Sequence, residues 1–482
     1  MQFGATIVVA RIAGAEVLGT VAYGIAFTSV FGFIADLGTG TAHIKLVSDK
    51  ENQADCNKTF LLVKLALIAL FALVILAYIF IKKQFFQFTF PSEIHRNVVF
   101  IAFAAAIVNH LISISSAIFR SKIEQAKQDI PNLTKTLINQ LLRISVVILG
   151  FGAIAITISS LVAVCTVLPI YIFYTSKYPF GSFDKVLFKK YLGISLPLIL
   201  VVASNSFIAF GEKLLLQRFT DSTELGFYIA GYRMSDFILL IATSIGLLFM
   251  PTFTEYINKN DFSNVNRLIH KFEQASYTLV LPIVLSLFFF SQSVISIFYG
   301  EEYVSSAKVL FIITLSLFIH TALIPYGNIL SASHKFTTLA ILSVFKALSF
   351  LILSYFLVSP NFAGLKSYGM SLSILGAQLC HSISLLLIVK IKYHKIKILS
   401  LYKIIIYAVV FNAILFLPLQ YWFNIPLKPL VQLTILPIYF ILFWVVGKIM
   451  EILPNQAFQI LFDILKVRKL FEYVKSELKN KS

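Results

Sequence analysis

Charged residues are scarce in this sequence: they make up 13% of the 482 residues, against roughly 25% in an ordinary soluble domain. Cysteine is also rare, and Cys56, Cys165 and Cys380 lie far apart without CxxC or Cys/His ligand spacing. The sequence therefore indicates neither a disulfide framework nor a metal site.

No GxxxxGK[ST] motif occurs, which disfavours an ATP-hydrolysing transporter. We expect no metal and no cofactor, and a soluble globule is excluded.

Long apolar runs are what the sequence has instead. Hydrophobic residues make up 58% of the chain, in runs of about 20 residues that suffice to cross a bilayer. Because these runs lack strict alternation, they favour helices over barrel strands. The sequence predicts an all-α integral membrane protein with thirteen complete spans: Val17 to Ala42, Thr59 to Ile81, Asn97 to Phe119, Leu137 to Ile156, Ser159 to Ser176, Leu192 to Gly211, Leu225 to Met250, Ala275 to Phe298, Ala307 to Ala332, Phe336 to Val358, Ser367 to Val389, Leu401 to Phe423 and Leu430 to Gly447.

The stretch Met1 to Ala13 is apolar but too short to span. It looks like the end of a helix whose beginning is missing, which makes about fourteen transmembrane helices with the first one truncated. With this numbering, 28 of the 40 Lys and Arg residues fall on one side of the membrane and 9 on the other. The positive-inside rule then predicts that both termini are cytoplasmic.

The net charge of +18 follows from basic cytoplasmic loops that face anionic lipid, so it does not indicate nucleic acid. Residues 451–482 carry apolar side chains at roughly helical spacing among lysines. They predict a basic amphipathic tail that lies on the cytoplasmic leaflet, with a solvated helix as the alternative.

An internal repeat suggests how the helices are grouped. At an offset of 207 residues, Val8 to Gly24 aligns without a gap with Leu215 to Gly231. The offset corresponds to six helices, which is typical of parallel transporter repeats whose two lobes enclose a central cavity and rock to give alternating access. We therefore expect an N-terminal lobe over residues 1–180, a C-terminal lobe over 181–390 and two added helices over 391–450. The identical pairs are Arg11 with Arg218, Leu18 with Leu225, Gly19 with Gly226 and Gly24 with Gly231.

Ionisable side chains at bilayer depth are costly unless they face a cavity or a partner. Lys346 lies ten residues into its span, about 15 Å down, and is expected to line the pathway, with a structural partner or snorkelling as the alternative. Arg233 and Asp236 share a helix face. They either neutralise each other, or Arg233 binds a phosphate oxygen while Asp236 orients it or titrates. Arg143, about 9 Å from the cytoplasmic end of its span, either snorkels or lines the cavity.

Asp36, in FIADLGTGTAHI, closes the second span near the cytoplasmic face. Capping or hinge function there competes with ligand or cation binding. His110, His320 and His381 fall near the middle of their spans, where a buried histidine is more often a hydrogen-bonded packing residue than a proton carrier. Because cationic side chains outnumber Asp236 among the deep positions, the sequence favours an anionic substrate.

Two regions resemble the Wzx-type polysaccharide flippases of the MOP superfamily, which also contains the MATE exporters and the lipid II flippase MurJ. These regions are ARIAGAEVLGTVAYG with FIADLGTGTAHIK, and ELGFYIAGYRMSD with MPTFTEY. Arg11 and Asp36 match the first region, and Arg233 and Asp236 match the second. The resemblance implies a MATE/MurJ-like fold of two pseudo-symmetric six-helix lobes around a cationic cavity, plus two C-terminal helices.

The resemblance also implies a function. The chain would be a flippase and not an enzyme, moving undecaprenyl-diphosphate-linked oligosaccharide to the outer leaflet of the bacterial cytoplasmic membrane with the help of an ion gradient. Its partners would be this glycan, membrane lipids, and a glycan polymerase and glycosyltransferases. The alternatives are a MATE-type drug/cation antiporter, a lipid II flippase and, less favoured because the outer loops are short, a membrane-embedded glycosyltransferase or polymerase. The predicted substrate-binding residues are Lys346, Arg233, Arg143 and Arg11, and the predicted coupling or gating residues are Asp36 and Asp236.

Overall fold

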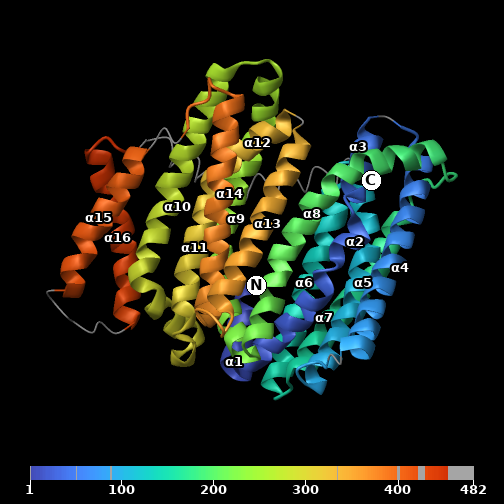
Figure 1. The fold of residues 1–482 in the computed structure, drawn as a ribbon, viewed down its shortest axis with the longest axis horizontal. Helices are drawn as coiled ribbons and strands as arrows, with labels where there is room; N and C mark the ends of the chain where they lie inside the picture. Colours follow the sequence, from blue (N-terminus) through green and yellow to red (C-terminus); the bar gives the residue numbers. More distant parts are fainter. Residues whose placement is uncertain are drawn as a thin grey trace. The chain divides into compact units, whose positions relative to one another are not determined.

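A computed structural model describes residues 2–49, 51–86, 89–333, 335–398, 402–421 and 429–453. Over these ranges the chain forms helices and no strand (Figure 1). The chain divides into two compact units, the first reaching Gly226 and the second beginning at Phe227. The expected all-helical architecture is confirmed, whereas the lobe boundaries given above stay a prediction.

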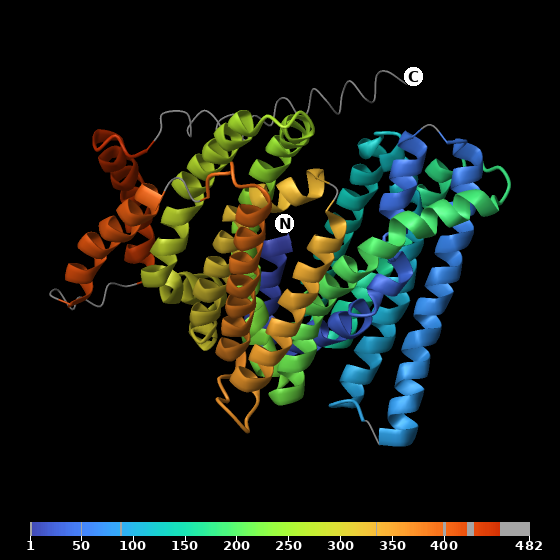
Figure 2. The same cartoon turned by 45° about the horizontal axis from the view of Figure 1, so that its top comes forward.

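The first unit is built around α5, which packs against α1, α3 and α7. Its apolar core includes Val9, Val98, Val147 and Ile156. Figure 2 shows these helices in blue to green. The helices are α1 (Gln2–Ser29), α2 (Gly32–Asp36), α3 (Thr39–Ser48), α4 (Gln53–Phe86), α5 (Glu93–Ser121), α6 (Gln125–Ile148), α7 (Ala153–Thr175), α8 (Lys185–Phe219) and the first turn of α9 (Ser222–Asn258).

The second unit contains the rest of α9 and all later helices. Within it α11 packs against α10 and α14, and α13 packs against α14. The helices are α10 (Phe262–Tyr299), the short 3-10 helix η1 (Glu301–Tyr303), α11 (Ser306–Ala322), α12 (Ile324–Ala332), α13 (Phe336–Val358), α14 (Lys366–Lys392), α15 (Tyr402–Tyr421) and α16 (Pro429–Ile449).

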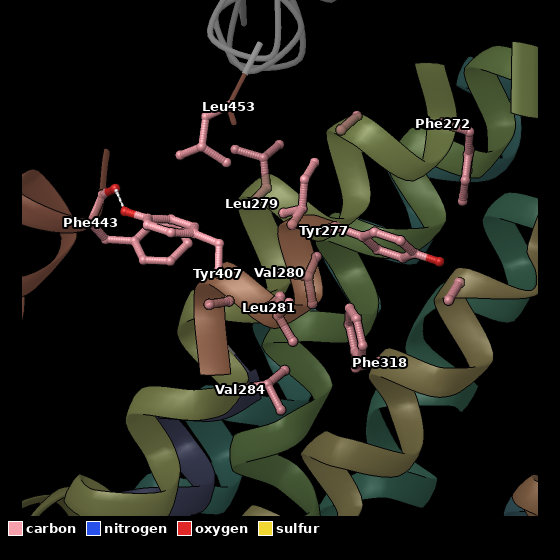
Figure 3. Packing of buried hydrophobic residues seen from close by; sticks show 14 residues of the cluster. Phe272, Tyr277, Leu279, Val280, Leu281, Val284, Phe318, Tyr407, Phe443 and Leu453 are labelled. Carbon is pink, nitrogen blue, oxygen red and sulfur yellow. Dashed lines mark hydrogen bonds between the residues drawn. The ribbon is translucent and has the colours of Figure 1, made fainter. Parts of the chain in front are cut away.

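The last two helices, α15 and α16, dock on α10 through a buried apolar cluster (Figure 3). Tyr407 of α15 donates a hydrogen bond from its hydroxyl to the carbonyl oxygen of Phe443 on α16, at 2.6 Å. A Cβ on Gly447 would lie 2.4 Å from the side chain of Leu453, so glycine is needed for this contact. The two added helices therefore belong to the second unit.

Every predicted span overlaps a helix or a broken pair of helices, but two predicted boundaries are wrong. The span Leu137 to Ile156 is interrupted, because α6 ends at Ile148 and α7 begins at Ala153. Between them Gly150 adopts a φ of 80°, a conformation that glycine reaches without steric cost. The span Val17 to Ala42 is also broken, and its last part continues to Ser48 as α3.

Two further irregularities bear on the membrane spans. The apolar stretch Met1 to Ala13 is followed by Gly14, whose φ of 81° and ψ of 173° kink α1 between this stretch and the span predicted from Val17. The pair α11 and α12 is bent by 41°. Within the described ranges, eight helices are long and apolar enough to cross a membrane, or nine if this bent pair forms one span.

The glycines of the internal repeat lie at close helix contacts. A Cβ on Gly19 would lie 1.8 Å from the carbonyl oxygen of Ser222, and a Cβ on Gly226 would lie 2.0 Å from that of Ala15. Ala15 and Ser222, like Gly19 and Gly226, are 207 residues apart. The contact between α1 and the start of α9 is therefore symmetric. Each helix places its repeat glycine against the carbonyl oxygen at the equivalent position of the other helix, as expected for a repeat.

The second glycine pair of the repeat makes equivalent contacts inside each unit. A Cβ on Gly24 would lie 2.4 Å from the Val98 side chain on α5, and a Cβ on Gly231 would lie 2.7 Å from the carbonyl oxygen of Ser306 at the start of α11. In the first unit Gly24 thus lets α1 pack against α5, and in the second unit Gly231 lets α9 pack against α11. This agreement supports the repeat beyond its few identities.

We expect Gly19→Ala to lower the thermal unfolding midpoint of the purified protein in detergent. The added methyl group would meet the backbone of Ser222, which cannot move aside like a flexible side chain, at a cost of about 1–3 kcal/mol. Gly4→Ala on the same helix is the matched control, since nothing lies within 4 Å of its Cβ position. Equal midpoints for the two variants would refute the close-packing argument.

Candidate binding site

The strongest candidate for a binding residue is Lys346, near the middle of α13. Its side chain is half-buried. Among the residues that the structure describes, none forms an ion pair or a hydrogen bond with it. The predicted deep lysine is therefore present without a fixed structural partner in this part of the chain.

Two histidines lie near Lys346. His320 is in the last turn of α11 and interacts electrostatically with both Lys346 and His381. His381, on α14, also interacts electrostatically with Lys346. We call His320, Lys346 and His381 the basic cluster. It joins three helices, two of which, α11 and α13, pack against the third, α14.

The helix that carries His320 is interrupted just beyond it. The backbone of Leu323 separates α11 from α12, and the two helices are bent by 41°. Irregular backbone at membrane depth is tolerated where protein buries it or where it lines a water-filled cavity. His320 is an exposed residue and lies three residues before this break.

No acidic residue is available from the second half of this unit. The sequence contains no Asp or Glu between residues 303 and 450, a range that covers α11 to α16. The helices that carry the basic cluster therefore offer it no carboxylate. Such an excess of positive charge suits an anionic ligand, because a charge inside a membrane needs a partner or water.

Arg233 and Asp236 form an ion pair on α9. The guanidinium donates to the carboxylate at 3.1 Å, and the two side chains are 50% and 35% exposed. Of the two alternatives that the sequence left open, mutual neutralisation is the one that the geometry displays. Arg233 can bind another anion only by sharing or leaving Asp236.

Asp36 is paired with a lysine that the sequence did not single out. The Lys64 ammonium on α4 donates to Asp36 Oδ1 at 2.5 Å and to the carbonyl oxygen of Ala35 at 3.0 Å. Lys64 is 1% exposed, whereas Asp36 is 42% exposed. Lys64 is one of the 28 basic residues that the positive-inside count places on the cytoplasmic side, but it is buried in α4 and is not a loop residue. Its position five residues inside the span Thr59 to Ile81 was the available signal.

The pair of Asp36 and Lys64 lies at the break between α2 and α3. Asp36 is the last residue of α2, and Leu37 and Gly38 follow with left-handed φ angles of 46° and 78°. The Thr39 hydroxyl donates to the Asp36 carbonyl oxygen at 2.6 Å. The second span therefore does not end at Asp36, and the ion pair ties a helix break to the neighbouring helix α4.

The two remaining predicted site residues lie in the first unit. Arg11 is exposed on α1, shortly before the kink at Gly14. Arg143 is half-buried on α6, which begins at Gln125 and ends at Ile148. It thus lies about 27 Å along the helix from Gln125 and about 8 Å from Ile148. α6 thus begins earlier than the predicted span, and the distance of Arg143 from the cytoplasmic face stays a prediction.

Two buried carboxylates were also missed. Glu212 on α8 is 2% exposed and pairs with Lys213 at 2.6 Å. Glu273 on α10 is fully buried, and its carboxylate accepts a hydrogen bond from Tyr326 at 2.7 Å. Like Asp36 and Asp236, each of these carboxylates has a donor within the described part of the chain.

Comparison with protein families gives one match: residues 8–308 fit the model of a family described as polysaccharide biosynthesis protein. A search of curated protein sequences finds no match.

Solved structures share the fold. The chain resembles a lipid II flippase MurJ in an inward closed conformation, with 18% identity, a TM-score of 0.72 and coverage of 93% of this chain and 96% of that one. It resembles an inward-facing multidrug resistance MATE family transporter of the MOP superfamily, with 16% identity, a TM-score of 0.66 and coverage of 81% and 93%. A MOP superfamily transporter from Pyrococcus furiosus matches with 16% identity, a TM-score of 0.55 and coverage of 81% and 97%.

These similarities confirm the MATE/MurJ-like membrane fold that the sequence predicted. The proteins that share it are described as flippases and transporters.

We expect Lys64→Met to destabilise the protein, because it leaves the Asp36 carboxylate beside a buried site without its counter-ion. Removing one partner of a buried ion pair costs about 3–5 kcal/mol, and less is expected here because Asp36 is 42% exposed. The double variant Asp36→Asn/Lys64→Met should recover much of the lost thermal stability in detergent. A double variant no more stable than Lys64→Met alone would contradict the pairing.

Proposed function

Because the chain belongs to the polysaccharide biosynthesis protein family, we propose that it is a flippase that carries a lipid-linked glycan across the bacterial cytoplasmic membrane. The substrate class is an undecaprenyl-diphosphate-linked oligosaccharide, which moves from the cytoplasmic to the outer leaflet. Alternating access, coupling to an ion gradient and cytoplasmic termini belong to the same proposal. So do a glycan polymerase and glycosyltransferases as partners.

The observation that carries the proposal is that no described residue pairs with Lys346, and that α11, α13 and α14 contain no acidic residue. A lysine at the centre of a membrane helix costs about 3 kcal/mol even on the most lenient scale. Replacing it by an apolar residue would remove this cost. An anionic headgroup that binds the Lys346 ammonium would offset this cost and explain why a lysine occupies this position.

A lipid diphosphate fits the chemistry of the basic cluster. Its headgroup carries negative charge that cannot cross hydrocarbon unaided, while its polyprenyl chain remains soluble in the bilayer. The Lys346 ammonium offers three donors and a compact charge, and the two imidazoles offer further nitrogen atoms. Arg11 and Arg143 are additional candidates for phosphate contacts, and Arg233 would contribute once it leaves Asp236.

A MATE-type antiporter of cationic drugs has the same fold and is the nearest alternative. Such a transporter needs carboxylates that are free to bind a cation. Here Asp36 pairs with Lys64 and Asp236 with Arg233, whereas Lys346 is a base without an acid. The charge balance of the described residues thus supports an anionic cargo.

We expect Lys346→Met to abolish display of surface glycan in a strain that lacks the chromosomal gene. Loss of a charge-assisted contact weakens binding by about 2 kcal/mol or more, so surface glycan should fall at least about tenfold. Methionine is well tolerated in a membrane helix, so the variant should reach the membrane in normal amounts. Membrane abundance and surface glycan are measured in the same cells.

Lys390→Met is the matched control, because Lys390 is an exposed lysine at the end of α14, and it should leave surface glycan unchanged. Normal glycan from Lys346→Met would contradict the proposal. If the wild-type protein restores drug resistance to the deletion strain but does not change its surface glycan, the antiporter is favoured instead.

A further inference from the structure

The two histidines of the basic cluster add a property that a lysine alone does not provide. We propose that His320 and His381 take up protons when a diphosphate binds beside Lys346, so that this site binds an anion and protons together. The inference rests on the proposed function and concerns the same site. It names the chemistry by which the pH of the surrounding water controls the affinity for the headgroup.

His381 has a ring nitrogen that needs a partner. Its Nδ1 atom is buried, and no described residue forms a hydrogen bond with it. A neutral imidazole presents one donor and one acceptor, whereas the imidazolium presents two donors. A buried polar atom left without a partner is costly, and a phosphate oxygen is an acceptor that would satisfy a protonated Nδ1.

His320 is an exposed residue near the middle of the α11–α12 pair. It also lies in the last turn of α11, where the helix dipole favours a positively charged side chain. The position therefore supports an imidazolium once the repulsion from neighbouring bases is relieved.

The charges around the two histidines explain why the ligand should change their protonation. The charged or titratable neighbours that interact with them are Lys346 for both and His381 for His320. These neighbours are all bases, so none of them offers a negative charge to a protonated imidazole. A bound dianion reverses this balance, because an opposite charge nearby favours the protonated form.

Other charged groups on the packed helices do not supply that negative charge. Among α10, α11, α12, α13 and α14 the only carboxylate is Glu273, which accepts a hydrogen bond from Tyr326. Glu301 and Glu302 lie on η1 between α10 and α11, and Asp236 on α9 is paired with Arg233. The other basic side chains on α10, α11, α13 and α14 are Arg267, His270, Lys271, Lys308, Lys366, Lys390 and Lys392, and the other titratable groups there are the phenols of Tyr277, Tyr299, Tyr355 and Tyr368 and the thiol of Cys380. The N-terminal flank of α13 adds Lys335. The negative charge must therefore come from the ligand.

The test is calorimetric titration of the full-length protein in lipid nanodiscs with farnesyl diphosphate, at pH 6 and pH 8, in buffers of different ionisation enthalpy. We expect the wild type to bind about tenfold more tightly at pH 6 and to take up protons on binding, as linkage requires. The double variant His320→Gln/His381→Gln should still bind the diphosphate but lose most of the pH dependence and most of the proton uptake. The proton uptake that remains in this variant measures protonation of the diphosphate itself.

His394→Gln is the matched control, because His394 is exposed in the segment after α14, and it should behave like the wild type. If the double variant keeps the pH dependence and the proton uptake of the wild type, the inference about the histidines is overturned. If Lys346→Met loses binding in the same experiment, the proposed function remains intact. If the wild type does not bind at either pH, or Lys346→Met binds equally well, both proposals fall.

Discussion

The constraint on which this account depends is the cost of an uncompensated positive charge in hydrocarbon. The chain contains several deep ionisable side chains, and most are arranged to avoid this cost. Lys64 is neutralised by Asp36, Arg233 by Asp236 and Lys213 by Glu212. Lys346 differs because no described residue neutralises it and because residues 303–450 contain no acid at all. The cost of an uncompensated charge thus explains why the other cations are paired, and it indicates that the basic cluster binds a ligand.

Close helix packing at glycines gives the fold a repeat geometry that charge does not determine. Gly19 and Gly226 bring α1 and the start of α9 into backbone contact, while Gly24 allows α1 to approach α5 and Gly231 allows α9 to approach α11. Helices in lipid associate through such close approach of backbones, because lipid is as apolar as their side chains. The second unit then adds α15 and α16 on α10 through an apolar cluster of its own.

Much of the fold could be predicted, because the length of an apolar run directly reflects the thickness of the bilayer. The depth of Lys346 followed from its place in one helix in the same way. Contacts between helices could not be predicted: nothing local announces that Lys64 reaches Asp36, or that His320 and His381 lie near Lys346. The break after Asp36 was foreseen only as one of two alternatives, and Gly38, with a left-handed φ of 78°, was its signal in the sequence. At the end of α6, Gly150 was a similar signal.

The most direct measurement is an experimental structure of the protein bound to a prenyl diphosphate lipid in nanodiscs. The account predicts density for the diphosphate within hydrogen-bonding distance of the Lys346 ammonium, on the surface that His320 and His381 share. A bound lipid whose phosphates lie elsewhere, with Lys346 covered by acyl chains or held by a carboxylate, would contradict it.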